Sequence, residues 1–100
     1  MSDLDHLDDN RIEKALIYLS STDELHAELS GQVKKLEDGV KQAKAHSFIL
    51  AEGTVAEREA KSIASDSYTD AVNEWIEAYK EFKIIENKRQ HEIKIGRAHV

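Results

Sequence analysis

A heptad pattern runs from Thr22 to Leu50 and constrains the fold of this chain more than any other feature. Mostly apolar residues recur there in steps of three and four, and the 100 residues include no proline that would interrupt a helix. The two core positions are filled by Thr22, Leu29, Leu36, Ala43 and Leu50 and by His26, Val33, Val40 and Ser47. Repeated heptads with charged residues between them predict a long coiled-coil helix.

Capping signals divide the rest of the chain. Hydroxyl side chains at Ser20-Ser21-Thr22 compete with helical hydrogen bonds, so we expect a short N-terminal helix to end there. Gly53 is expected to end the long helix in the left-handed conformation. Thr54 and Glu57 then form a capping box that starts a short connector, and the cluster Ser65-Asp66-Ser67 starts the last helix.

The last predicted helix carries an aromatic stripe. Its members alternate in steps of three and four and are Tyr68, Val72, Trp75, Tyr79 and Phe82. Two long helices with a short connector favour an antiparallel hairpin, in which this stripe packs on the heptad seam and Leu36 lies opposite Phe82. We therefore expect an all-α, coiled-coil-like helical hairpin with a short N-terminal helix and a short helical connector.

The chain is expected to form one domain with two extensions. Residues 1–9 are acidic and contain no lysine or arginine, which is typical of a flexible tail. Residues 10–94 form the single helical domain. Residues 95–100 read as a translated fragment of a DNA-sequencing adapter, so we expect them to be non-native and assign them no function.

A hairpin of two helices leaves both of its flanks open, which predicts a homo-oligomer. The apolar residues expected to form the core and assembly seam are Leu29, Val33, Leu36, Val40, Leu50, Val72, Trp75, Tyr79 and Phe82.

Cations are concentrated in two parts of an acidic chain. The net charge is −6, yet residues 32–46 and 80–100 each contain more basic than acidic residues. In the expected hairpin Lys44 lies near the level of Lys80, so the two basic stretches partly coincide. A positive patch attracts a phosphate backbone, whereas the alternative is an ordinary solvated surface with i,i+4 ion pairs. The candidate nucleic-acid contacts are Lys34, Lys35, Lys41, Lys44, Lys80 and Lys83.

The sequence contains no pattern typical of an enzyme. It has no cysteine, glycine-rich phosphate loop or G-x-S-x-G motif, and no Glu-x-x-His pair of the kind used in di-metal bundles. Glu74 and Glu77 are the best candidates for a Mg²⁺ site, but no second acidic cluster accompanies them. We expect no catalytic residue, metal or cofactor. The apolar runs are too short to cross a membrane, which favours a cytoplasmic protein.

Three stretches resemble a known group of proteins: Lys41-Gln42-Ala43-Lys44-Ala45-His46, Leu50-Ala51-Glu52-Gly53 and the run from Val55 to Lys61. The chain is similar, from Leu16 to Lys94, to small helical bacteriophage proteins of recombination and replication, and more distantly to UvsY recombination mediators. The resemblance implies a ring-forming protein that binds single-stranded DNA and helps to load a recombinase against a single-strand-binding protein. The basic motif of the family maps onto Lys44 and His46.

Two functions follow as hypotheses. The first is a non-enzymatic phage accessory protein of DNA recombination or replication, which binds single-stranded DNA, a recombinase or both as an oligomer in the host cytoplasm. The alternative is a helical scaffold or adaptor that binds other proteins without binding nucleic acid.

Overall fold

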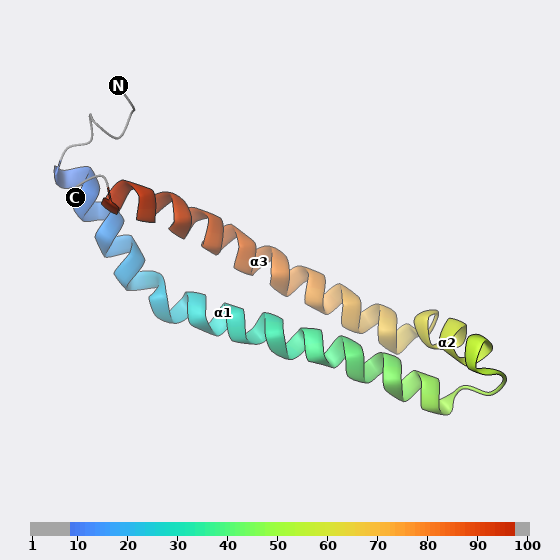
Figure 1. The fold of residues 1–100 in the computed structure, drawn as a ribbon. Helices are drawn as coiled ribbons and strands as arrows, with labels where there is room; N and C mark the ends of the chain where they lie inside the picture. Colours follow the sequence, from blue (N-terminus) through green and yellow to red (C-terminus); the bar gives the residue numbers. More distant parts are fainter. Residues whose placement is uncertain (1–8, 98–100) are drawn as a thin grey trace, which may run out of the picture.

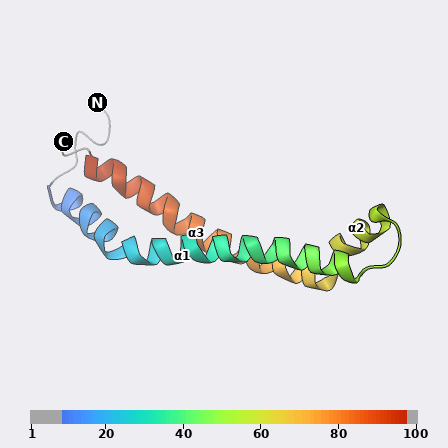
Figure 2. The same ribbon diagram turned by 60° about the horizontal axis from the view of Figure 1, so that its bottom comes forward.

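The computed structural model describes residues 9–97, which form an antiparallel helical hairpin (Figure 1). Its helices are α1 (Asp9–Leu50), α2 (Val55–Ile63) and α3 (Asp66–Arg97). Figure 1 shows α1 and α3 side by side, with α2 at the closed end. The molecule measures 66 × 27 × 18 Å, and Figure 2 shows the two long helices crossing. The predicted all-α hairpin with a short helical connector is confirmed.

The N-terminal part of α1 differs from the prediction. Ser20-Ser21-Thr22 does not end a short helix, because α1 continues through it. The hydroxyls of Ser21 and Thr22 instead donate to the carbonyl oxygen of Tyr18 at 3.0 and 2.7 Å. Such bonds within a helix bend it without ending it, and α1 bends in its light-blue part, near residue 20 on the colour bar (Figures 1 and 2). Asp9 begins α1, and residues 1–8 of the predicted acidic tail lie outside the described residues.

The closed end of the hairpin follows the capping signals. Gly53 has a φ of 119°, where a Cβ would collide with the Glu57 side chain, so a residue without a side chain is required. Thr54 caps α2 by accepting a hydrogen bond from the Glu57 backbone N–H at 3.2 Å. Ser65 accepts a hydrogen bond from the Tyr68 N–H at 3.3 Å at the start of α3. The predicted breaks between the helices are therefore confirmed.

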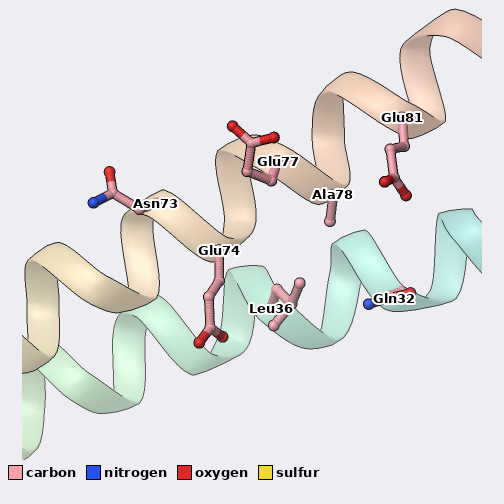
Figure 3. A pocket seen from close by; sticks show the side chains of 7 residues that line it. All are labelled: Gln32, Leu36, Asn73, Glu74, Glu77, Ala78 and Glu81. Carbon is pink, nitrogen blue, oxygen red and sulfur yellow. The ribbon is translucent and has the colours of Figure 1, made fainter.

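The register of the hairpin differs from the predicted one. The Phe82 ring lies against the His26 ring in a tilted arrangement, with ring centroids 5.3 Å apart, and Leu36 faces Ala78 (Figure 3), so the pairing of Leu36 with Phe82 is wrong. The register differs because α2 already runs back along α1. The Ser62 hydroxyl of α2 donates a 2.6 Å hydrogen bond to the Lys44 carbonyl oxygen of α1. The chain therefore reverses near Gly53, and not in the middle of the connector.

Few apolar side chains are fully buried. Within residues 9–97 the buried hydrophobic residues are Ile12, Ala15, Ala78 and Ile95. Ile95 belongs to the segment expected to be non-native, and it packs with Ile12 and Ala15. The large apolar side chains that stay exposed are Leu16, Ile17, Leu25, Ile49, Leu50, Val55, Ile63, Ile76, Tyr79 and Ile84. The hairpin thus presents many large apolar side chains on its surface.

Candidate assembly surface

The open end of the hairpin is held by arginines of both long helices. Arg11 donates from both terminal nitrogens to Glu92, each at 2.9 Å. Arg89 donates to the Leu19 carbonyl at 2.8 Å, to the Thr22 hydroxyl at 2.6 Å, and to the Asp23 carboxylate. We call this group of side chains the arginine clamp.

Arg89 belongs to the basic stretch 80–100, but unlike a solvated surface cation its side chain is only 12% exposed. A signal was present, because Arg89 follows Phe82 by one heptad and therefore lies on the face of α3 that packs on α1. A long, cationic side chain on a packing face is expected to find acceptors on the opposite helix.

The Arg11–Glu92 pair is ionised in the folded state. The hydrogen bonds from Arg11 lower the pKa of Glu92, and they outweigh the desolvation that acts in the opposite direction. The same contact raises the pKa of Arg11. Glu92 is only 7% exposed, so its charge depends on Arg11 for compensation.

The predicted seam lies mostly between α1 and α3. Its half-buried members are Leu29, Val33, Leu36, Val40, Val72, Trp75 and Phe82. Leu50 and Tyr79 do not belong to it, since they are 69% and 40% exposed. Leu50 is the last residue of α1, where the chain turns away, and Ala78 occupies the buried position in place of Tyr79. Tyr79 instead stacks on Trp75 with ring centroids 5.2 Å apart.

Grooves follow the seam along both of its sides. Gln32 precedes the seam residue Leu36 by four positions, and Lys44 follows the seam residue Val40 by four positions. Gln32 and Lys44 therefore lie on opposite sides of the seam. The groove residues on the side of Gln32, which we call the glutamate flank, are Leu25, Leu29, Gln32, Leu36, Asn73, Glu74, Glu77, Ala78, Glu81, Ile84 and Ile85. Those on the side of Lys44, the lysine flank, are Glu37, Val40, Lys41, Lys44, Ala45, Phe48, Ile49, Glu59, Tyr68, Val72 and Trp75.

The structure brings four of the six predicted lysines to the side of the lysine flank, and Lys35 and Lys80 are the exceptions. Lys41 and Lys44 line its groove, and Lys34 precedes Lys41 by one heptad on the same face of α1. On α3, Lys83 follows Tyr79 by one helical turn, and the Tyr79 ring stacks on Trp75 of this flank. Lys80 instead pairs with Glu77, which lines the glutamate flank. Lysines from both long helices therefore share one side of the hairpin.

Most of these lysines already have an acidic partner. The ion pairs are Lys34–Asp38 at 3.5 Å, Lys44–Glu59 at 3.8 Å, Lys80–Glu77 at 3.5 Å and Lys83–Glu86 at 2.9 Å. The hydrogen bond to Glu86 raises the pKa of Lys83. Within residues 9–97, Lys35 and Lys41 take part in no ion pair. Lys44 lies beside α2, so the expected proximity of Lys44 to Lys80 is wrong.

The glutamate flank contains a groove of about 470 Å³ over Leu36. Figure 3 shows that Glu74 and Glu81 point toward α1, whereas Glu77 points away from it. Their carboxylates therefore do not converge, and within the described part of the chain no group of three or more acidic or histidine side chains is placed to hold a metal ion. Of the helices described, none combines the length and apolar character needed to cross a membrane.

Comparison of the chain with protein-family models, curated proteins and solved structures gives no match. The flanks and the arginine clamp are therefore the basis on which a function has to be inferred.

Proposed function

We propose that this protein is a non-enzymatic helical assembly module that functions as a homo-oligomer. The observation that carries the proposal is the exposure of large apolar side chains along the glutamate flank, where Ile84 is 67% and Leu25 43% exposed. Contiguous apolar surface of this kind marks sites of protein–protein contact.

The shape of the hairpin supports the same conclusion. A pair of helices has no third layer to cover its seam, so residues such as Leu36 and Trp75 stay half-buried. Complete burial of one large apolar side chain contributes about 1.5–3 kcal/mol relative to full exposure. A partner that covers one flank therefore gains more apolar burial than the hairpin can achieve alone.

Thermal unfolding at several protein concentrations tests assembly. Because an oligomer is stabilised by mass action, we expect the Tm of the full chain to rise steadily as its concentration increases. The measurement is circular dichroism at 222 nm, with the same buffer throughout. A Tm that does not change with concentration would contradict the proposal.

A second candidate function is binding of single-stranded DNA by the lysine flank, as expected for a phage accessory protein of recombination or replication acting with a recombinase or single-strand-binding protein in the host cytoplasm. The observation in its favour is that lysines from α1 and α3 share one side with the exposed Tyr79 ring. Cations attract phosphates, and exposed aromatic rings stack on bases.

Fluorescence anisotropy with a labelled oligothymidylate tests this second function. We expect binding at about 50 mM salt that weakens steeply as salt increases, since each phosphate contact releases a counterion. The double variant Lys41→Ala/Lys44→Ala should weaken binding, and Lys35→Ala is the matched control on the other side of α1. Absence of binding at about 50 mM salt would rule out this function and leave the assembly proposal unaffected.

A further inference from the structure

The exposed part of the glutamate flank has a charge pattern that is complementary to that of a second copy running in the opposite direction. On α3, Glu81, Ile84, Ile85 and Lys88 follow at helical spacing and share one face. Lys88 is placed on this flank by its contact with Tyr18, whose ring centroid lies 4.6 Å from the lysine Nζ. An apolar patch on α3 thus has an anion one turn before it and a cation one turn after it.

The neighbouring face of α1 extends the apolar patch. Leu25 and Leu29 line a groove of about 320 Å³ together with Ile84 and Ile85, and the only charged residue in its lining is Glu81. Tyr18 precedes Leu25 by one heptad and lies on the same side of α1. We call Leu25, Leu29, Ile84 and Ile85 the isoleucine–leucine patch.

Symmetry selects the orientation of a second copy on this patch. The midpoint between Ile84 and Ile85 is equally far along α3 from Glu81 and from Lys88. A two-fold axis that passes this midpoint at right angles to α3 places the α3 helix of a second copy alongside in the antiparallel direction. It therefore sets Lys88 of one copy opposite Glu81 of the other and the apolar patches against each other. A parallel pairing of the same helices would instead oppose Glu81 to Glu81 and Lys88 to Lys88.

We infer that the isoleucine–leucine patch binds a second copy of this chain in antiparallel orientation, forming a two-fold symmetric four-helix bundle. This inference rests on the proposed assembly function and specifies its interface. The bundle covers Ile84 and Leu25, the exposed apolar residues of the glutamate flank. It leaves the lysine flank of both copies on the outside.

A pair of aspartate substitutions tests the location of the interface. Ile84→Asp places a charge at the two-fold axis of both copies, and we expect it to raise the dimer dissociation constant by about 100-fold. Ile49→Asp is the matched control, because Ile49 is 69% exposed on the lysine flank and should leave the dissociation constant unchanged. Sedimentation velocity gives the constants, and circular dichroism checks that both variants keep their helix content.

Charge reversal tests the antiparallel orientation. Glu81→Lys and Lys88→Glu should each weaken the homodimer, because like charges then face each other across the axis. An equimolar mixture of the two variants should form a heterodimer, since both contacts are again between opposite charges. The heterodimer is identified by native mass spectrometry with one variant labelled with ¹⁵N.

The outcomes distinguish a failure of the proposed interface from a failure of the proposed assembly function. A wild-type chain that is monomeric at every concentration would overturn both the assembly proposal and this inference. A wild-type oligomer that is insensitive to Ile84→Asp, or a mixture in which no heterodimer forms, would overturn the inference alone. In that case assembly stands and another surface mediates it.

Discussion

Arg89→Ala should lower the free energy of unfolding by about 3 kcal/mol, because it removes charged hydrogen bonds that join α3 to α1. Arg89 is 12% exposed and donates to the Leu19 carbonyl and the Thr22 hydroxyl as well as to Asp23. Without it, the acceptors at the bend of α1 lose a partner that water replaces only in part. Urea unfolding at pH 7, followed by circular dichroism, measures the loss.

Two further variants show whether the loss comes from the clamp. Arg89→Lys keeps the charge but cannot donate to several acceptors in a fixed fork, so we expect it to recover only part of the stability. Lys35→Ala removes an exposed cation of α1 and should change the free energy of unfolding by less than about 0.5 kcal/mol. Equal effects of Arg89→Ala and Lys35→Ala would show that Arg89 does not hold the hairpin together.

Glu92→Gln should lower the free energy of unfolding at pH 7 by about 1.5 kcal/mol and reduce its dependence on acid pH. Arg11 lowers the pKa of Glu92 in the folded state below its ordinary value of 4.5. The stabilisation from this carboxylate is therefore fully present above the pKa of the unfolded chain. It is lost as the pH falls through the lower pKa of the folded chain.

The measurement is urea unfolding at a series of pH values from neutral to acid, compared between the wild type and Glu92→Gln. We expect the two curves of stability against pH to be separated at pH 7 and to converge in acid, where Glu92 is protonated in the wild type. Glu28→Gln is the control, because Glu28 is exposed and takes part in no ion pair within residues 9–97. Parallel curves for the wild type and Glu92→Gln would contradict the assigned role of the pair.

The fold was predictable because local signals agree with it. The heptad residues of α1 from Thr22 to Ser47 are all half-buried, as a coiled-coil pattern predicts. Gly53 and Thr54 separate α1 from α2 where the hairpin reverses. Gly53 adopts a positive φ, and the Thr54 hydroxyl caps the first turn of α2. These features depend on near neighbours in the sequence.

The features that were not predicted depend on contacts between distant residues. Hydroxyl side chains such as those of Ser21 and Thr22 are found both where helices end and where helices bend, so the sequence alone does not distinguish the two. At the bend, the Thr22 hydroxyl also accepts a hydrogen bond from Arg89 of α3. The register depends on how α2 packs, which the hydrogen bond from Ser62 to Lys44 fixes and the heptads do not encode. Ala78 takes the buried place on the seam that was expected for Tyr79, because α3 is rotated about its axis relative to the expected arrangement.

The candidate site was only partly predictable for a similar reason. The lysines could be found from local charge, and Lys83–Glu86 has the i,i+3 spacing of a local helix pair, but the pairing of Lys44 with Glu59 depends on how α2 packs on α1. The heptad spacing places Arg89 on the packing face of α3, but the partners in the arginine clamp lie 66 to 81 positions apart, so the local pattern does not identify them. The glutamate flank became visible only when the register placed Leu25 beside Ile84.

Native mass spectrometry of the full chain over a range of concentrations tests self-assembly most directly. Two-fold pairing through the isoleucine–leucine patch predicts a species of twice the 11.3 kDa chain mass that dissociates on dilution, and predicts a single-chain mass for Ile84→Asp under the same conditions. A wild-type mass of 11.3 kDa at every concentration would contradict the account.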